Sequence, residues 1–426
     1  MGVLFSSIQW AIFILAGSIV APLSIGAAFH LPAQEIAALI QRTFFVIGIG
    51  TLLQVYFGHR LQISEGPAGL WWGVFLLFAG FASSMNLDTY EVLRNLEAGL
   101  LISGACFFVL SGLKLIHKVK QIFTPLVTGT YLLLLIAQLS SSVVKGIFGI
   151  GYLKPGVDLK VMFLAIVTLI FAVILAQSPY PKLRNFSVLC AIGFGWVLFA
   201  LFGAAGRVNM QGIRWFSAPE IFAWGLPKFD FGIIFISVFT SLLLLSNLIA
   251  SMEVVDRVVE RKETLNYNRA GFIMGCNQML SAVFSTVGFV PVSLAAGFIK
   301  TTNIREKRPF IIGSALILGI SFFPIITMFF ASLPTPVGYA AIFLSFSSMV
   351  GLALREYATA GLTETNLFII GISLLVGIGS LFVPAEALED LPGFLMTLLN
   401  NGLILGVLTC IFIEQGIHLL KRSNKM

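Results

Sequence analysis

Charged side chains are scarce in this chain of 426 residues. Lysine, arginine, aspartate and glutamate make up 11% of it, whereas hydrophobic residues make up 58% and the mean hydropathy is +0.98. A soluble domain carries about 25% charged residues. The composition therefore excludes a soluble enzyme, a disordered chain and a nucleic-acid-binding protein, and it predicts a protein that crosses a membrane many times.

Several chemical motifs are also missing. The four cysteines, Cys106, Cys190, Cys276 and Cys410, lie inside apolar stretches without a CxxC pair, which favours neither a disulfide framework nor a zinc site. There is no HExxH or GxGD motif, and residues 371–374 (GISL) lack the intramembrane histidine that a serine protease needs, because all four histidines lie in loops or at span ends. We therefore expect no enzyme, no cofactor and no metal site.

Apolar sequence is abundant instead. A helix needs about 20 apolar residues to cross a bilayer, and the alternating pattern of β-barrel strands is absent. The predicted fold class is an all-α polytopic membrane protein with 14 transmembrane segments. These segments are 6–29, 34–57, 65–83, 98–116, 123–143, 159–177, 186–205, 231–254, 270–286, 290–300, 309–331, 336–354, 366–383 and 392–415.

Lysine and arginine predict the orientation of these spans. With the N-terminus on the cytoplasmic side, 18 of the 26 basic residues fall on that side, 7 fall outside, and Arg42 lies within a span. The acidic segments 88–97 and 386–390 then become outer loops. This asymmetry also accounts for the net charge of +7, and it predicts a multi-pass protein of the cytoplasmic membrane with both termini cytoplasmic.

Two spans contain Gly and Pro where a continuous helix is expected. The third opens with residues 65–69 (EGPAG), and the tenth region contains residues 287–293 (VGFVPVS). Each is the third span of a half in a seven-plus-seven arrangement, and because seven is odd, the halves become inverted repeats. A matched pair of interrupted segments is the best sequence indicator of a transporter's binding site at the membrane midplane.

Three segments resemble one known family. They are Gln9-Trp10 with Ala21-Pro22, residues 41–54 (QRTFFVIGIGTLLQ), and residues 58–62 (GHRLQ) with Glu65-Gly66. They are similar to the nucleobase–cation symporter type 2 family (uracil, xanthine and uric acid permeases; nucleobase–ascorbate transporters), and the resemblance covers nearly the whole chain. It implies short strands in segments 3 and 10 that meet at the midplane.

The resemblance also implies a division into two domains. Segments 1–4 (residues 1–120) and 8–11 (residues 229–331) would form a core domain. Segments 5–7 (residues 121–228) and 12–14 (residues 332–426, with the cytoplasmic tail) would form a gate domain. The implied function is secondary active transport of purine-type nucleobases (xanthine, uric acid, uracil or related heterocycles) by elevator-like alternating access. A proton or sodium ion would be the coupling cation, and the family allows a homodimer.

Matching this sequence to the family's motifs gives the implied substrate-binding residues. They are Gln9, Ala68, Gly69, Asn247, Ser293, Ala296 and Gly297. The chain departs from the family here, because the family's histidine is Trp10 and its two ligand glutamates fall on Asn247 and Gly297. None of these three residues titrates.

Glu65 is the acidic residue associated with an interrupted segment. A lone carboxyl group at such a depth must be neutral, paired or in contact with water. We therefore expect Glu65 to be the coupling residue, with a solvated strand end beside His59 and Arg60 as the alternative.

Other residues have structural alternatives as well. Asn247 suits an interhelical hydrogen bond, and Trp10, Trp71 and Trp72 suit core packing or interface anchoring as well as the walls of a binding slot. Arg42 is expected to pair or to extend towards the outer surface. For the whole protein, the missing glutamates leave open an anion transporter of the sulfate-permease type and a non-transporting binding or sensor protein on the same scaffold. We expect no nucleic-acid partner.

Overall fold

The computed structural model describes residues 2–84, 87–116, 118, 124–180, 183–184, 186–206, 214–260, 264–388, 390–392, 395 and 398–423. The described chain is mostly helical. Its helices before the midpoint are α1 (Val3–Ser18), α2 (Val20–Ala28), α3 (Ala33–Phe57), α4 (Gly69–Ser84), α5 (Thr89–Gly112), α7 (Pro125–Ile147), α8 (Leu159–Ala176) and α10 (Ser187–Leu201). The later ones are α11 (Phe231–Val259), α12 (Tyr267–Val283), α13 (Ala295–Thr302), α14 (Lys307–Ile320), α15 (Pro324–Ala331), α16 (Thr335–Ala360), α17 (Glu364–Ser380), the 3-10 turn η1 (Ala385–Leu388) and α19 (Gly402–Ser423).

Helix starts follow from local sequence. Thr124 caps α7 by accepting a hydrogen bond from the N–H of residue 127, and Pro125 occupies the first turn, where its missing N–H costs nothing. Asp158, Asp230 and Asn266 cap α8, α11 and α12 in the same way. These side chains satisfy backbone donors that a membrane interior would leave without partners.

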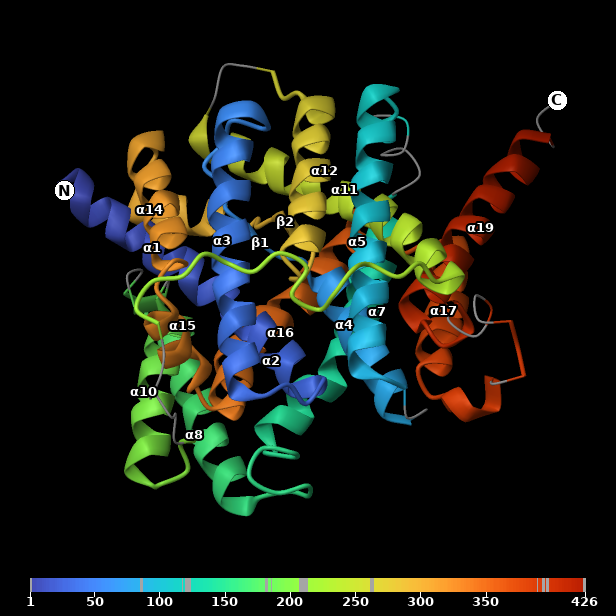
Figure 1. Ribbon diagram of the computed structural model, residues 1–426. Coiled ribbons are helices and arrows are strands. Elements are labelled where there is room, and N and C mark those ends of the chain that lie inside the picture. Colours follow the sequence, from blue (N-terminus) through green and yellow to red (C-terminus); the bar gives the residue numbers. More distant parts are fainter. Residues whose placement is uncertain are drawn as a thin grey trace.

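The helices pack as two groups. In the first group α12 packs on α5 and α3, α14 packs on α1 and α3, and α11 packs on α5 (Figure 1). In the second group α16 packs on α7 and α8, while α19 packs on α17 and α7. Contacts of α2 with α16, α4 with α7 and α1 with α10 join the two groups. The substrate residues expected from the sequence lie on α1, α4, α11 and α13, except for Ala68 and Ser293, which shortly precede α4 and α13.

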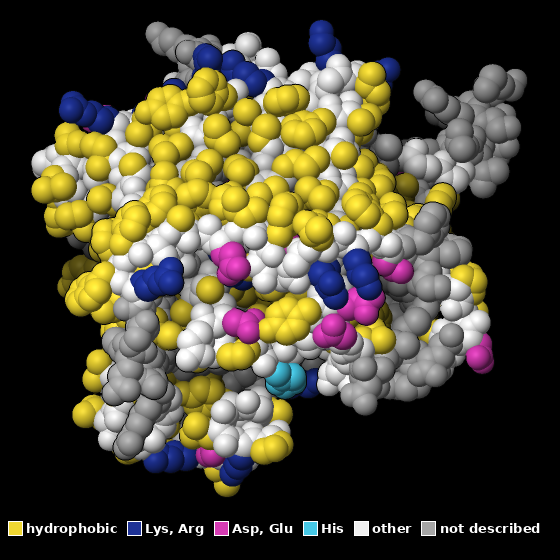
Figure 2. Space-filling view, viewed as in Figure 1, with side chains coloured by type: hydrophobic (Ala, Val, Ile, Leu, Met, Phe, Trp, Pro, Cys, Tyr) yellow, Lys and Arg dark blue, Asp and Glu magenta, His cyan; other side chains and the backbone are white. Residues whose placement is uncertain are grey.

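Six helical stretches in the described residues are long and apolar enough to cross a membrane. They are α1 with α2, then α3, α5, α7 and α8, and most of α11. The consecutive helices α14 and α15 meet at a bend of 89°. If this pair counts as one span, the number of such stretches in the described residues rises to seven. Figure 2 shows a broad hydrophobic band on one face, with basic side chains along its upper edge and mixed charges below it. These features indicate a multi-pass membrane protein.

Two short strands interrupt the helices. β1 (Glu65–Pro67) and β2 (Phe289–Pro291) pair antiparallel, with Glu65 opposite Pro291 and Pro67 opposite Phe289. They lie in the two segments rich in Gly and Pro described above. Proline disfavours a continuous helix, and backbone groups at this depth have no water to bind, so each strand supplies the hydrogen bonds that the other lacks. We call this pair the ribbon.

An irregular segment, residues 214–230, runs from α10 towards α11 across the first helix group (Figure 1). Gln41 of α3 donates a hydrogen bond of 2.9 Å to the carbonyl oxygen of Ser217. The N–H of Phe222 donates to the carbonyl oxygen of Val283, at the end of α12, over 2.8 Å. These bonds attach the segment to α3 and α12, and we call it the strap.

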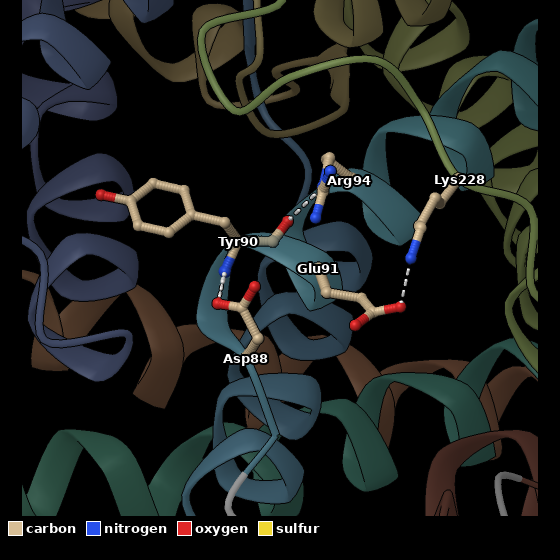
Figure 3. Close-up of polar contacts among 5 residues, drawn as sticks. All are labelled: Asp88, Tyr90, Glu91, Arg94 and Lys228. Carbon is tan, nitrogen blue, oxygen red and sulfur yellow. Dashed lines mark hydrogen bonds and ion pairs between the residues drawn. The ribbon is translucent and has the colours of Figure 1, made fainter.

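The strap is also attached to the start of α5, as Figure 3 shows. Lys228 forms an ion pair of 2.6 Å with Glu91, and its N–H donates to the carbonyl oxygen of Arg94. Asp88 caps α5 by accepting from the N–H of Tyr90. The sequence-based prediction of an outer loop over residues 88–97 is therefore wrong, because the cap and the buried apolar positions that follow it make residues 89–97 helical.

Candidate functional site

The ribbon has a helix start at each end. The N–H of Ala68, just after β1, donates to the carbonyl oxygen of Gly288, and α4 begins at Gly69. The N–H of Val292, just after β2, donates to the carbonyl oxygen of Ser64, and α13 begins three residues later. Because the strands are antiparallel, the N-termini of α4 and α13 lie at opposite ends of the ribbon. Helix N-termini carry partial positive charge and spare N–H donors.

The residues expected from the sequence at these helix starts differ in exposure. Ala68 and Ala296 are buried, whereas Ser293 and Gly297 are exposed. A Cβ built on Gly297 would meet no atom within 4 Å, and one built on Gly69 would lie 3.5 Å from Leu135 of α7. The start of α13 therefore borders open space, and the start of α4 faces the second helix group.

Asn247 lies half-buried on α11, one turn before Ser251. The hydroxyl oxygen of Ser251 lies 3.2 Å from Oδ1 of Asn247 and 2.8 Å from the carbonyl oxygen of Pro291. A hydroxyl group has one proton, and the shorter contact favours Pro291 as its acceptor. Ser251 thereby ties α11 to β2, and Asn247, one turn away on the same helix, lies close to the ribbon.

Gln9 lies half-buried on α1, and its buried Oε1 has no hydrogen-bond partner among the residues that the structure describes. The next residue, Trp10, is fully buried and packs on Phe298 of α13 and Phe310 of α14, with ring centroids 4.4 and 4.8 Å apart. Trp10 therefore fills the core and does not wall an open slot. Its packing fixes α1, and with it Gln9, beside α13.

Glu65 is buried, unlike Ser293 and Gly297 near the start of α13. Its side chain is 1% exposed and faces the amide of Asn277 on α12, and neither carboxyl oxygen makes a hydrogen bond within the described residues. Its N–H donates to Thr51 of α3 over 2.9 Å. The burial contradicts the alternative of a solvated strand end. The contacts place the carboxyl group inside the first helix group.

Two buried amides of α12 that the sequence did not single out lie beside the ribbon. Gln278 of α12 donates a hydrogen bond of 2.7 Å to the carbonyl oxygen of Phe289. Its neighbour Asn277 is fully buried, and neither amide atom has a hydrogen-bond partner within the described chain. The sequence signal for these residues is a pair of adjacent amide side chains inside an apolar span. The groups that they face belong to other segments of the chain, so the sequence does not identify them.

A second buried group surrounds Arg42 in the first half of α3, and the sequence singled out none of its other members. Arg42 is 3% exposed, donates through Nε to the carbonyl oxygen of Ser285 over 3.1 Å, and stacks over the ring of Trp224 in the strap. Glu97 of α5 is fully buried and accepts a hydrogen bond from the hydroxyl group of Ser285. Arg42 is thus paired inside the protein, which is one of the two outcomes expected for it.

In the described residues no three His, Cys, Asp or Glu side chains converge as metal ligands.

Residues 1–386 match the family model described as Permease family (Xan_ur_permease). Relatives include the putative purine permease YwdJ of Bacillus subtilis (strain 168), 44% identical over 422 residues that cover 97% of this chain and 96% of the relative. The xanthine permease XanP of Escherichia coli (strain K12) is 23% identical over 424 residues, covering 96% and 91%. The uric acid permease PucJ of Bacillus subtilis (strain 168) is 21% identical over 419 residues, covering 96% and 91%.

Two solved structures have a similar fold. The transmembrane domain of a cyanobacterium bicarbonate transporter, BicA, superimposes with a TM-score of 0.61 at 15% identity, covering 96% of each chain. The murine anion transporter Slc26a9 in its inward-facing state gives a TM-score of 0.64 at 13% identity, covering 98% of this chain and 68% of that one. At these identities the likeness shows the fold alone.

Proposed function

The chain belongs to the Permease family (Xan_ur_permease), and on this premise we propose that it transports purine-type nucleobases across the cytoplasmic membrane. Its family relatives are transporters, and the chain is not an enzyme. The names of the relatives point to purines, xanthine and uric acid as the substrate class.

The observation that carries this function is the ribbon with a helix start at each end. A nucleobase has a flat apolar face and an edge of alternating donors and acceptors, so its site needs apolar walls and a few placed polar groups. The start of α13 carries the partial positive charge of a helix N-terminus beside open space, and Asn247 supplies an amide that both donates and accepts. The proposed substrate residues remain Gln9, Ala68, Gly69, Asn247, Ser293, Ala296 and Gly297.

The proposed mechanism is elevator-like movement of a core domain against a gate domain. The core comprises residues 1–120 and 229–331, and the gate comprises residues 121–228 and 332–426; the boundary at 120–121 lies outside the described residues. The separate packing of the two helix groups supports the division. In the first gate half, α7 contacts α4 and α10 contacts α1, and most of the strap, which also falls in this half, is attached to core helices. The proposal includes 14 spans as a seven-plus-seven inverted repeat, with both termini cytoplasmic.

Coupling is proposed to run through Glu65. The buried carboxyl group faces an uncharged amide, so a change in its protonation alters the charge inside the core. A proton is the proposed coupling ion, and sodium is the alternative. A homodimer also stays part of the proposal on family grounds.

The function is tested by ligand-induced stabilisation of the purified full chain. A ligand at 100 times its dissociation constant stabilises the folded state by about 2.7 kcal/mol. We expect xanthine, uric acid or another purine to raise the melting temperature, and radiolabelled uptake into proteoliposomes to select the same compound. Stabilisation by bicarbonate or sulfate alone would contradict the proposal in favour of an anion transporter. Binding without uptake would favour a sensor.

A further inference from the structure

A line of buried polar side chains runs between α3 and α12, which pack against each other (Figure 1). No member exposes more than 1% of its surface. The members are Glu65, Thr51, Asn277, Ser281, Thr286, Thr43, Ser285 and Glu97. We call this line the polar seam. Intramembrane polar groups are costly, and ionisable ones commonly belong to proton pathways.

One end of the polar seam is the ribbon. The carboxyl group of Glu65 faces Asn277, and the N–H of Glu65 donates to Thr51. Asn277 in turn lies against α3, since a Cβ on Gly50 would come within 3.0 Å of its amide carbon. Both carboxyl oxygens of Glu65 are buried without hydrogen-bond partners in the described chain.

The middle of the polar seam consists of hydroxyl groups. Ser281 lies four residues after Asn277 on α12, which places both on one face of the helix. The N–H of Thr286 donates to the carbonyl oxygen of Ser281. Thr286 then meets Thr43 of α3, with 2.8 Å between their hydroxyl oxygens. The hydroxyl groups of Ser281 and Thr43 also donate to the carbonyl oxygens of Asn277 and Leu39, so passing a proton onward requires each hydroxyl group to turn away from its carbonyl.

The other end of the polar seam is Glu97. Its Oε1 accepts from the hydroxyl group of Ser285, next to Thr286, whereas its Oε2 is buried without a partner in the described chain. The charged groups facing Glu97 are Arg42 of α3 and Arg94 of its own helix, and Arg42 also faces Glu220 of the strap and Glu35 of α3. No charged group faces Glu65 in the described residues. The two carboxyl groups therefore differ in their electrostatic surroundings: Glu97 faces cations and Glu65 faces an uncharged amide.

We propose that Glu97 is a second proton-binding site and that the polar seam carries a proton between it and Glu65. The step conserves charge: the O–H bond of a neutral Glu65 breaks, a proton moves along the hydroxyl groups, and a new O–H bond forms on the carboxylate of Glu97. This inference rests on the proposed coupling role of Glu65. It gives the coupling proton a route inside the core, separate from the exposed substrate residues at the start of α13.

Infrared difference spectroscopy of the purified full chain in lipid tests the proposal without any substrate. Near pH 7 exposed carboxyl groups are ionised, so bands of protonated carboxyl groups report on buried ones. We expect titration between about pH 5 and pH 8 to change two such bands. Glu97→Gln should remove one and Glu65→Gln the other. If Glu97→Gln leaves every band unchanged, Glu97 binds no proton in this range and the proposal is overturned.

A second variant guards against loss of folding. Ser285→Ala keeps the carboxyl group of Glu97 but removes its hydrogen-bond donor. The band assigned to Glu97 should then shift in frequency. A spectrum identical to that of the unchanged chain would contradict the assignment.

The route is tested by exchange into heavy water. Ser281→Ala should slow deuterium exchange at Glu65 by about tenfold, equivalent to a barrier higher by about 1.4 kcal/mol. Ser314→Ala is the matched control, because Ser314 is 1% exposed and also donates to a carbonyl four residues earlier, but on α14 away from the polar seam. Equal exchange rates in both variants would overturn the route. Because no ligand is used, failure of nucleobase binding leaves these results readable.

Discussion

The hydroxyl group of Ser251 on α11 donates to the carbonyl oxygen of Pro291 over 2.8 Å. Pro291 is the last residue of β2 and lies opposite Glu65 in the ribbon. The bond therefore ties α11, which carries Asn247, to the strand pair between the two helix starts. The position of Asn247 relative to the ribbon depends on this contact.

Replacing Asn247 should weaken nucleobase binding with little loss of folded protein. Asn247→Ala removes one hydrogen bond to the base edge, which costs on the order of 1–2 kcal/mol, or about five- to thirtyfold in affinity. Equilibrium binding of radiolabelled xanthine to purified protein measures the change. Asn366→Ala is the control: it removes an amide that caps carbonyl groups near the start of α17 and should lower the melting temperature without changing affinity. Equal affinities in both variants would remove Asn247 from the site.

Gly297→Val should abolish binding without destabilising the fold. The added side chain projects into space in which a Cβ meets no atom within 4 Å, so it obstructs the ligand and not the protein. Valine also has a slightly higher helix propensity than glycine. Gly371→Val is the matched control, because Gly371 is an exposed helical glycine on α17 with equally open surroundings. Both variants should keep the parent melting temperature, and only Gly297→Val should lose xanthine binding.

A methyl group added at Gly288 should destabilise the fold, in contrast to the change at Gly297. A Cβ there would lie 2.2 Å from Cδ1 of Trp71 and 2.6 Å from Oε1 of Gln278, both fully buried. Gly288→Ala should therefore destabilise the protein by about 1–3 kcal/mol through overpacking. Gly371→Ala should be neutral or stabilising. Melting temperatures of the two variants in detergent provide the comparison, and a stable Gly288→Ala variant would show that the ribbon tolerates displacement.

The fold class was accessible from sequence, and much of the site's support was not. A paucity of charge and long apolar stretches suffice for a multi-pass helical protein, and proline marks the interrupted segments locally. Glu97 is different, because it follows several charged residues that resemble a loop. The polar groups that accompany its burial, Ser285, 188 positions away, and Arg42, come from distant segments. The role of Gln278 likewise depends on a carbonyl group in β2.

Joining α4 to α7 should arrest transport if the core moves against the gate. Nε2 of Gln138 on α7 lies 3.4 Å from the carbonyl oxygen of Gly73 on α4. The pair Gly73→Cys and Gln138→Cys, in a chain whose four free cysteines have been replaced, can be bridged by a short bifunctional thiol reagent. We expect the bridged protein to bind xanthine but to lose uptake into proteoliposomes. Each single-cysteine variant, treated identically, should keep its uptake, and a bridged protein that still transports would contradict the elevator mechanism.

Glu65→Gln tests the proposed coupling directly. Glutamine mimics the neutral acid and cannot release a proton, so the variant should bind nucleobase with an affinity independent of pH between about 5 and 8. If Glu65 carries the coupling proton, protonation accompanies binding in the unchanged chain, so affinity should be higher at the acidic end and fall as the pH rises. Uptake by the variant should no longer respond to an imposed proton gradient.

The control for Glu65→Gln is Glu364→Gln, which removes a carboxyl group from the first turn of α17 and should leave the pH profile unchanged. Identical pH profiles for the unchanged chain and Glu65→Gln would show that Glu65 does not carry the coupling proton. Sodium-dependent uptake would then separate the remaining cases. A response to a sodium gradient indicates sodium coupling, because a sodium ion, and not a proton bound by Glu65, then links uptake to an ion gradient. Uptake that follows only the nucleobase gradient indicates a facilitator. In that case Glu65, in its uncharged surroundings, has a structural role alone.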